Sequence, residues 1–113
     1  PMAVVTNKPL LFSEAILEKL GVRGCFQTIS GGDSGMPLKP APDAFKKIMA
    51  DRGILQQDTV IVGDGTTDVR GGKAAGAMTC AVTYGFRSEE LLRREGPDYI
   101  INQFSELVGL FAP

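Results

Sequence analysis

The sequence predicts an α/β fold, a parallel sheet of about five strands with flanking helices. Short apolar runs rich in β-branched residues alternate with segments of helical periodicity along the whole chain, and this alternation is typical of βαβ units. The 113 residues are enough for one modest domain. Because no internal repeat, low-complexity stretch or interdomain linker interrupts them, we predict one structural unit over residues 1–113.

In the first half of the chain, two predicted strands each precede a helix. Pro9 suits the first turn of a helix, because a proline lacks the N–H that has no partner there. Gly21 and Gly53 end the two helical patterns, and the loop after the second strand holds three glycines and a proline. The predicted elements are a strand at 3–6, a helix at 9–20, a strand at 26–29 and a helix at 42–52.

The second half repeats this order three times. The run from Thr59 to Val62 is β-branched, continuous and ended by a glycine, and it is the clearest strand. The helix after it contains Gly71 and Gly72, each costing about 1 kcal/mol relative to alanine, and we expect close packing on the sheet to explain them. Ser88 suits the N-cap of a short helix. The predicted strands are 59–62, 78–82 and 99–101, and the predicted helices are 67–75, 88–95 and 104–111.

Composition argues against several kinds of partner and site. The formal net charge is −1, so we expect no surface for nucleic acid or for an anionic membrane. No apolar run reaches the roughly 18 residues that a membrane span needs. The chain contains no histidine, and Cys25 and Cys80 lack metal-ligand spacing. We therefore predict two buried, reduced thiols, no zinc site and a cytoplasmic location.

Polar residues follow three of the predicted strands where each strand ends. Thr6 and Asn7 follow the first strand, Lys39 lies in the loop after the second, and Asp64 and Asp68 come after the third. Because ligands of open α/β sheets bind outside the carboxyl ends of the strands, we expect these side chains to converge. Hydroxyl, amide and lysine donors suit phosphate, and aspartate oxygens suit Mg²⁺. The sequence therefore predicts a site for a phosphate and a divalent cation.

Each of these residues, taken alone, also has a structural explanation. Thr6 and Asn7 are common in strand-end turns and helix caps, and Lys39 could be a solvated loop lysine. Asp64 and Asp68 could cap the following helix. The segment is neither a dinucleotide fingerprint, since Asp68 stands where the third glycine belongs, nor a calcium loop. Their occurrence together, at strand ends and in this order, favours the functional interpretation.

The order of these motifs resembles that of the haloacid-dehalogenase-like hydrolases, and the later segments resemble the phosphoglycolate phosphatases of this superfamily most. The resemblance covers nearly the whole chain and implies a Rossmann-like fold. It rests on residues 4–8, 39–43, 62–68, 73–77, 82–86 and 97–107.

The resemblance implies a role for each site residue. Thr6 would donate a hydrogen bond to the transferring phosphoryl group with Asn7 beside it, and Lys39 would bridge that group and the attacking carboxylate. Asp64 would ligate Mg²⁺, and Asp68 would support the metal shell directly or through water. The implied reaction is the Mg²⁺-dependent hydrolysis of a small phosphorylated metabolite through a phospho-aspartate, with 2-phosphoglycolate as a candidate substrate.

The family also uses residues that this chain does not contain. Its nucleophile and acid/base aspartates stand two residues apart on the first strand of the fold, at the centre of the sheet, and five residues precede Thr6 here. We expect the chain to be the C-terminal part of the core domain, without the nucleophile strand and the substrate-selecting cap, and inactive alone. Two strand edges would then flank a gap. They would pair with each other, associate between chains, pair with a missing N-terminal segment, or leave the chain partly stable.

Two other classes of protein fit part of the pattern. A non-catalytic phosphate- or metal-binding or interaction module would keep the phosphate and metal supports without an attacking group. A receiver-like signalling domain also arranges aspartates and a lysine around Mg²⁺, but Asp64 lies in the wrong order for its acceptor. An aspartate pair upstream of Thr6 would separate the phosphatase from the module.

Overall fold

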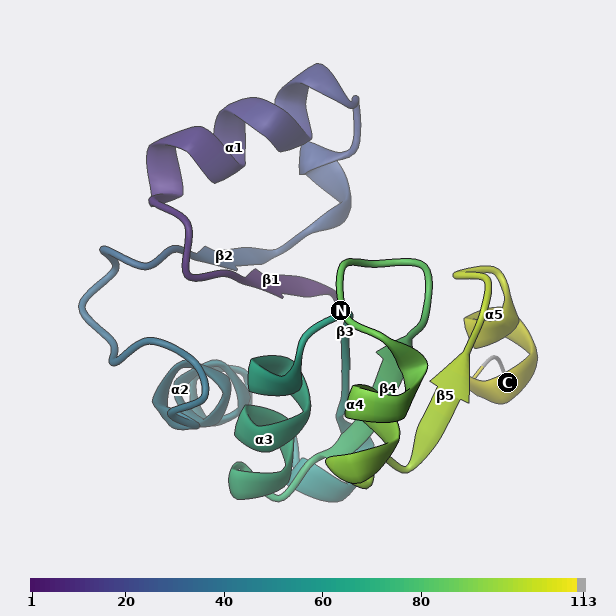
Figure 1. Ribbon diagram of the computed structural model, residues 1–113. Coiled ribbons are helices and arrows are strands. Elements are labelled where there is room, and N and C mark those ends of the chain that lie inside the picture. The colour runs from purple at the N-terminus through teal and green to yellow at the C-terminus, as the bar shows by residue number, and fades with distance from the viewer. Residues whose placement is uncertain (112–113) are drawn as a thin grey trace.

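Five parallel strands form two separate sheets in the computed structural model, which describes residues 1–111 (Figure 1). All pairings in both sheets are parallel. The α/β class and the expected strands are confirmed, but the strands do not form one continuous sheet. The smaller sheet pairs β1 (Ala3–Val5) with β2 (Thr28–Ser30), and the larger has the order β3 (Val60–Gly63), β4 (Met78–Val82) and β5 (Tyr99–Ile101).

A helix follows every strand, as the alternating pattern predicted. The helices are α1 (Leu10–Lys19), α2 (Asp43–Arg52), α3 (Thr66–Ala74), α4 (Glu89–Arg94) and α5 (Glu106–Phe111). Two short 3₁₀ turns, η1 (Arg23–Cys25) and η2 (Gln56–Asp58), precede β2 and β3. The first of these turns explains why β2 begins two residues later than expected.

Local signals in the sequence fix several helix ends. Gly53 ends α2 with a left-handed φ of 62°. The Ser88 hydroxyl caps α4 by accepting a hydrogen bond from the Leu91 N–H at 3.3 Å. The start of α1 is capped from a distant part of the sequence, because Asp33 Oδ1 accepts a hydrogen bond from the Leu10 N–H at 2.9 Å. Residues of the loop after β2 therefore hold the helix after β1.

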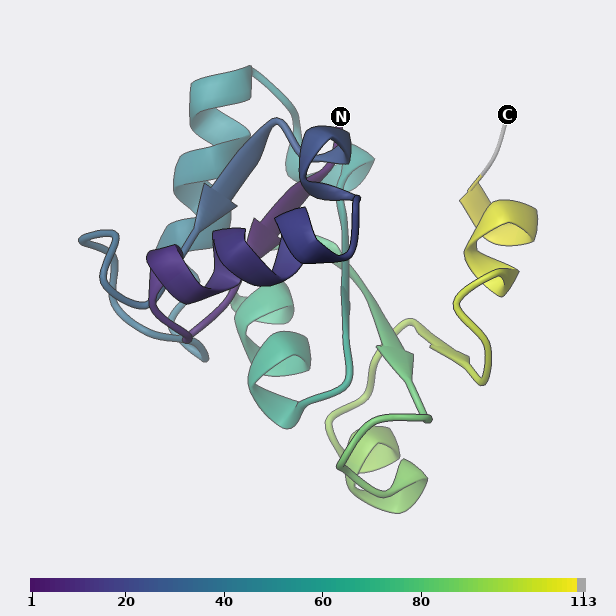
Figure 2. The same ribbon diagram turned by 90° about the horizontal axis from the view of Figure 1, so that it is seen from above.

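Helices cover both faces of each sheet (Figures 1 and 2). α1 and α2 lie on opposite sides of the β1–β2 pair. In the larger sheet, one face packs Ala81 against Val69 of α3 and Leu92 of α4, and the other turns Cys80 and Val82 toward α5. Because successive strand residues point to opposite faces, β4 contributes to both cores.

The adjacent glycines of α3 allow this helix to lie close to its neighbours. A Cβ atom at Gly72 would lie 2.7 Å from Thr79 Cγ2 of β4 and 3.1 Å from Ile61 Cβ of β3. A Cβ at Gly71 would lie 2.9 Å from Phe45 Cε2 of α2. All three distances are shorter than an ordinary van der Waals contact. The expected close packing on the sheet is confirmed for Gly72, whereas Gly71 packs against α2.

The strands β1 and β3 do not pair with each other, so one of the expected alternatives, direct pairing across the gap, is wrong for this structure. Instead, side chains connect the two sheets. Phe45 and Met49 of α2 form a cluster with Ala75, and Val5 of β1 and Ile61 of β3 pack against it. The two sheets therefore share a core while keeping separate hydrogen-bond ladders.

The two cysteines have different environments. Cys80 is buried, with 1% of its surface exposed, and burial followed by the nearby charge of Glu106 raises the pKa of its thiol. Cys25 is exposed in the η1 turn, so the prediction of two buried thiols is wrong for this residue. No helix among residues 1–111 is long and apolar enough to cross a membrane.

Candidate active site

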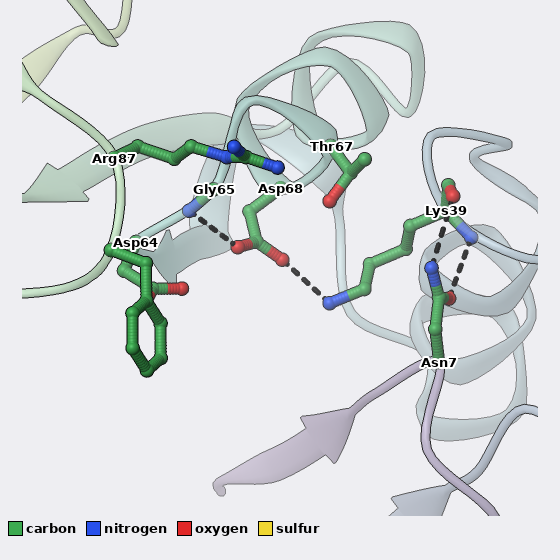
Figure 3. A pocket seen from close by; sticks show the side chains of 8 residues that line it. Asn7, Lys39, Asp64, Gly65, Thr67, Asp68 and Arg87 are labelled. Atoms are coloured by element: carbon green, nitrogen blue, oxygen red, sulfur yellow. Dashed lines mark hydrogen bonds and ion pairs between the residues drawn. The ribbon is translucent and has the colours of Figure 1, made fainter.

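A pocket of about 440 Å³ opens where β1, β3 and β4 end (Figure 3). Its volume lies in the range of small-molecule sites, roughly 300–1,000 Å³. Four of the five predicted site residues line it, each from a different turn of the chain or a different strand end. The lining residues are Asn7, Lys39, Asp64, Gly65, Thr67, Asp68, Phe86 and Arg87.

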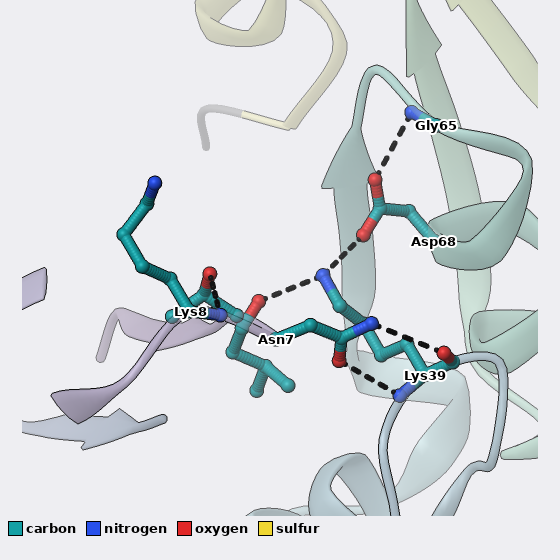
Figure 4. Close-up of polar contacts among 7 residues, drawn as sticks. Asn7, Lys8, Lys39, Gly65 and Asp68 are labelled. Carbon is teal, nitrogen blue, oxygen red and sulfur yellow. Dashed lines mark hydrogen bonds and ion pairs between the residues drawn. The ribbon is translucent and has the colours of Figure 1, made fainter. Parts of the chain in front are cut away.

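Lys39 is held in the pocket from both ends. Its Nζ donates hydrogen bonds to Asp68 Oδ1 at 2.6 Å and to the Val5 carbonyl at 2.9 Å (Figure 4). Its backbone is fixed by Asn7, whose Oδ1 accepts from the Lys39 N–H at 2.9 Å and whose Nδ2 donates to the Lys39 carbonyl at 3.1 Å. The side chains of Lys39 and Asp68 are 12% and 14% exposed. The ammonium group is therefore largely shielded, paired and fixed in place.

Asp68 has both a local and a long-range partner. It stands in the first turn of α3, where its Oδ2 accepts a hydrogen bond from the Gly65 N–H at 3.1 Å while its Oδ1 faces Lys39. A Cβ atom at Gly63 would overlap the Asp68 carboxylate, so the glycine at the end of β3 makes room for it. The capping role and the site role proposed for Asp68 are thus compatible.

Asp64 is the pocket carboxylate that is left without a partner. Within residues 1–111 its side chain makes no hydrogen bond and no ion pair. Gly85, in the loop after β4, lies against it so closely that a Cβ atom there would overlap the Asp64 carboxylate. Both oxygens of this carboxylate are therefore available to an incoming cation.

The donor set of the pocket fits Mg²⁺. Asp64 and Asp68 are the carboxylates among the lining residues, and the described residues 1–111 contain no cluster of three or more metal-binding side chains. Mg²⁺ is commonly bound through one or two carboxylates and completes its shell with water and substrate phosphate oxygens. Two hard oxygen donors beside a fixed lysine match that chemistry.

Comparison with known proteins identifies the family. A model of the haloacid dehalogenase-like hydrolases matches residues 1–82. The chain belongs to this family of hydrolases. The resemblance inferred from the motifs is confirmed, and the segments that carry Thr6, Asn7, Lys39, Asp64 and Asp68 all lie within the match.

Relatives named phosphoglycolate phosphatase match nearly all of the chain. The one from Pectobacterium atrosepticum is 34% identical over 110 residues, which is 97% of this chain and 47% of the relative. The one from Escherichia coli K12 is 34% identical over 108 residues, which is 96% of this chain and 43% of the relative. The chain therefore spans just under half the length of these relatives.

Solved structures of similar sequence share the fold. A predicted phosphoglycolate phosphatase from Haemophilus somnus has a TM-score of 0.90 at 30% identity, over 96% of this chain and 48% of that chain. A predicted phosphatase from Clostridium acetobutylicum has a TM-score of 0.84 at 33% identity, over 96% of this chain and 50% of that chain. The arrangement of strands and helices described above is thus that of hydrolases in this family.

Thr6 is the predicted site residue that the structure places outside the larger pocket. Its Oγ1 accepts a hydrogen bond from the Lys8 N–H at 3.1 Å, as in the strand-end turn considered for it. It lines a small neighbouring cavity of about 10 Å³, and Asn7 and Lys39 line both spaces. Thr6 therefore shares the small cavity with Lys39 and does not line the larger pocket.

Phe86 and Arg87, which come from the loop after β4, were not among the predicted site residues. The strand from 78 to 82 was expected, and the rule that ligands bind beyond the carboxyl ends of strands applies to it as well. The same rule, applied to β4, predicts that residues of the loop after this strand line the pocket. Thr67 also lines the pocket and was not predicted, because a role had been assigned only to Asp64 and Asp68 in the segment after β3.

Proposed function

We propose that this chain is part of a Mg²⁺-dependent phosphatase that hydrolyses a small phosphorylated metabolite, with 2-phosphoglycolate as the candidate substrate. The reaction would proceed through a phospho-aspartate, and the attacking aspartate would come from outside these 113 residues. One observation carries the proposal: Lys39, Asp64 and Asp68, far apart in the sequence, line one pocket at the strand ends. The names of the relatives support the choice of substrate.

In this proposal Lys39 binds the phosphoryl group. An ammonium has three donors, and two of them are used on Asp68 and Val5, so the third is available to a phosphoryl oxygen. Because Asp68 and the Val5 carbonyl fix the nitrogen in advance, little reorganisation is needed when negative charge develops. Asp68 acts as the residue that positions Lys39.

Thr6 and Asn7 support the phosphoryl group from the end of β1. Both polar atoms of the Asn7 side chain are already bonded to the backbone of Lys39, which favours a contribution from the backbone N–H of Asn7 over its amide. The Thr6 hydroxyl accepts from Lys8 and keeps its own hydrogen for donation. Thr6 would reach the phosphoryl group from the small cavity behind Lys39.

Asp64 would hold the Mg²⁺ ion, with Asp68 supporting the metal shell from the next turn. A bound Mg²⁺ ion supplies positive charge that stabilises the phosphoryl oxygens in phosphoryl transfer. The chain contributes the position of the carboxylate: Asp64 follows β3 directly, and the bare backbone of Gly85 leaves room for it.

The open edges of β1 and β3 are where the proposal places the nucleophile strand, supplied by an N-terminal segment or another chain. Residues Ala3 and Val5 present their backbone groups to that side, since the Thr6 N–H donates to Ser30 of β2 and alternate residues of a parallel ladder face opposite edges. The free thiols of Cys25 and Cys80 suit the cytoplasm, which we propose as the location.

A phosphatase assay on the full-length gene product tests the function. We expect phosphate release from 2-phosphoglycolate that requires Mg²⁺, and a loss of about 100-fold or more in kcat when Asp64→Ala or Lys39→Met is introduced. Asp51→Ala, which removes an exposed carboxylate of α2, is the matched control and should leave kcat unchanged. If Asp64→Ala kept the activity of the wild type at ordinary Mg²⁺ concentrations, the metal assignment would be wrong.

The second candidate is a non-catalytic module that binds phosphate or a metal ion. The carboxylates that line the pocket within residues 1–111 favour this candidate. Asp68 is paired with Lys39 and Asp64 is the proposed metal ligand, so no third carboxylate there is available to attack a phosphoryl group. Sequencing the source gene upstream of Pro1 separates the two. A strand ending in Asp-x-Asp supports the phosphatase, and a start codon immediately before the codon of Pro1 supports the module.

A further inference from the structure

Arg87 is a cation of the pocket without a partner among residues 1–111. It comes from the loop after β4, and its side chain extends along the pocket toward Asp68 and Thr67 (Figure 3). No carboxylate among residues 1–111 lies within 4.0 Å of its guanidinium group, and it makes no hydrogen bond there. Four other arginines have carboxylate partners, namely Arg23, Arg70, Arg93 and Arg94.

The two cations of the pocket differ in how their charge is used. Lys39 is shielded and paired with Asp68 at 2.6 Å, whereas Arg87 is exposed and its donors are free. They reach the pocket from different elements, Lys39 from the loop after β2 and Arg87 from the loop after β4, with Asp68 between them in Figure 3. A ligand with a second anionic group besides its phosphoryl group would contact both cations.

We propose that Arg87 is a specificity-determining residue that binds the carboxylate of a small phosphorylated acid whose phosphoryl group lies at Lys39. This proposal rests on the phosphatase function proposed above. The planar guanidinium group presents a fork of donors that matches the two oxygens of a carboxylate. A phosphate monoester with an uncharged second end would leave this fork unsatisfied.

Phe86 supports a short ligand that bridges the two cations. Its side chain lines the same pocket and is fully exposed, at 100%. The ring provides an apolar surface in a pocket whose other side chains are mostly polar or charged, among them Arg87 and the two carboxylates. It would contact the carbon atoms between the phosphoryl group and the carboxylate, which is how small-molecule sites combine apolar contact with a few charged anchors.

A pair of substrates that differ in one group tests the role of Arg87. 2-Phosphoglycolate and ethyl phosphate both carry a phosphoryl ester on a two-carbon unit, but ethyl phosphate lacks the carboxylate. In the full-length gene product, Arg87→Met should lower kcat/KM for 2-phosphoglycolate by about 10- to 100-fold, the range of a charged hydrogen-bonded contact. The value for ethyl phosphate should change by less than about 3-fold. For 2-phosphoglycolate, the kcat/KM of Arg87→Lys should lie between those of the wild type and Arg87→Met. Lysine keeps the positive charge but lacks the paired donors of the guanidinium group.

Arg94→Met is the matched control, since it removes an arginine that lies on α4 outside the pocket and pairs with Glu90. Arg94→Met should leave kcat/KM unchanged for both substrates. Equal losses for both substrates in Arg87→Met would mean that Arg87 binds the phosphoryl group, and no loss for either would mean that it binds neither. Both results overturn the proposal.

An equilibrium measurement keeps this test separate from the proposed function. By calorimetric titration of the wild-type protein without Mg²⁺, where no turnover is expected, 2-phosphoglycolate should bind about 10-fold or more tightly than ethyl phosphate, and Arg87→Met should remove the difference. If neither ester were hydrolysed, the phosphatase proposal would fail while this difference in affinity would still support the carboxylate site. If the wild-type protein bound both esters with equal affinity, the carboxylate site at Arg87 would be wrong, whether or not the esters are hydrolysed.

Discussion

At the scale of single residues, Lys39 links parts of the chain that share no hydrogen-bond ladder. Its Nζ bonds to the Val5 carbonyl of β1 and to Asp68 of α3, the helix that packs on β3. One ammonium therefore connects the strand ends of the two sheets and at the same time supplies charge to the pocket. A residue with both roles should affect stability as well as activity when it is changed.

A double-mutant cycle on Lys39 and Asp68 tests this coupling. Either Lys39→Met or Asp68→Asn leaves the other charge unpaired in a shielded position, and we expect each to lower the unfolding free energy by about 1–3 kcal/mol. The double variant should lose less than the sum of the single losses, by about 0.5–3 kcal/mol. Urea unfolding of the 113-residue chain gives these values.

The control is the exposed pair Lys47–Asp51 on α2, whose side chains are 55% and 60% exposed. A cycle on that pair should give a coupling of about 0.3–0.5 kcal/mol. If the losses at Lys39 and Asp68 were additive, the hydrogen bond between them would contribute nothing to stability.

Gly85 provides a test of the Asp64 position. A methyl group at residue 85 would overlap the Asp64 carboxylate, so Gly85→Ala should displace the proposed ligand and raise the Mg²⁺ concentration needed for half-maximal activity by about 10-fold or more. Gly24→Ala, where a Cβ atom would meet nothing within 4 Å, is the matched control. Activity of the full-length gene product against Mg²⁺ concentration is the measurement, and an unchanged dependence in Gly85→Ala would argue against Asp64 as a ligand.

The residues of the site were predictable to different degrees. Lys39, Asp64 and Asp68 follow predicted strands, and the parallel order of the strands is enough to bring them together. The pairing of Asp68 with Lys39 was not predictable, because the two are 29 residues apart and the sequence contains no signal for side-chain direction. Arg87 also follows a predicted strand and lies where the same rule places a ligand, but it was not among the predicted site residues.

At the scale of elements, the packing of α3 depends on its two glycines. Gly72→Ala would place a methyl group 2.7 Å from Thr79 Cγ2 and 3.1 Å from Ile61 Cβ, which is anchored in β3. The gain in helix propensity, about 1 kcal/mol, should be outweighed by the cost of overpacking, about 1–3 kcal/mol. We therefore expect Gly72→Ala to lower the unfolding free energy in urea titrations.

Gly109 in α5 is a control that changes helix propensity without changing side-chain packing. A Cβ atom there would meet nothing within 4 Å, so Gly109→Ala should leave stability unchanged or raise it by up to about 1 kcal/mol. If Gly72→Ala raised the stability as Gly109→Ala should, close packing would not explain the glycine at position 72.

The link between α3 and the end of α4 should weaken in acid. Arg70 donates two hydrogen bonds to the Glu95 carboxylate, at 2.6 and 2.8 Å, and these bonds lower the pKa of Glu95 below its ordinary value of 4.5. Because the folded chain has the lower pKa, the stabilisation is present above pH 4.5 and is lost as the pH falls through the pKa of the folded state. Arg70 is exposed and Glu95 is half-buried, so the effect should be small and partly screened by salt.

Glu95→Gln makes this pH dependence measurable. The variant keeps the backbone carbonyl of residue 95, which accepts from Lys73 Nζ at 2.9 Å, and removes the titrating group. The difference in unfolding free energy between wild type and variant should be largest above pH 4.5 and approach zero in more acidic solution. A difference that stayed constant with pH would mean that the Arg70–Glu95 contact does not contribute through its charge.

Elements were easier to predict than their pairing. The β-branched run in β3, the glycine after α2 and the cap at Ser88 are local signals, and each element lies where these signals put it. Strand pairing depends on groups that are distant in the sequence. The Asp33 cap on α1, for example, joins residues 23 apart and leaves no periodic signal in either segment.

At the scale of the whole molecule, the two sheets meet through side chains alone. The cluster of Phe45, Met49 and Ala75 and the bond from Lys39 to Val5 join them, while the facing edges of β1 and β3 keep unpaired backbone groups. Unpaired strand edges are templates for pairing with another chain. One open-edge carbonyl, that of Val5, is already occupied by Lys39, so the remaining groups of β1 lie toward Ala3.

We therefore predict that the 113-residue chain associates through this edge when no other segment covers it. In sedimentation equilibrium its weight-average mass should rise with concentration. Ala3→Pro should reduce this rise, because proline removes an N–H that faces the open edge and is tolerated in edge strands, while the bond from Thr6 to Ser30 of β2 is retained. Ala3→Ser, which keeps the N–H, should behave like the wild type. A wild-type chain that stayed monomeric at all concentrations and unfolded in one cooperative transition would show that the shared core is sufficient and that the edge of β1 needs no partner.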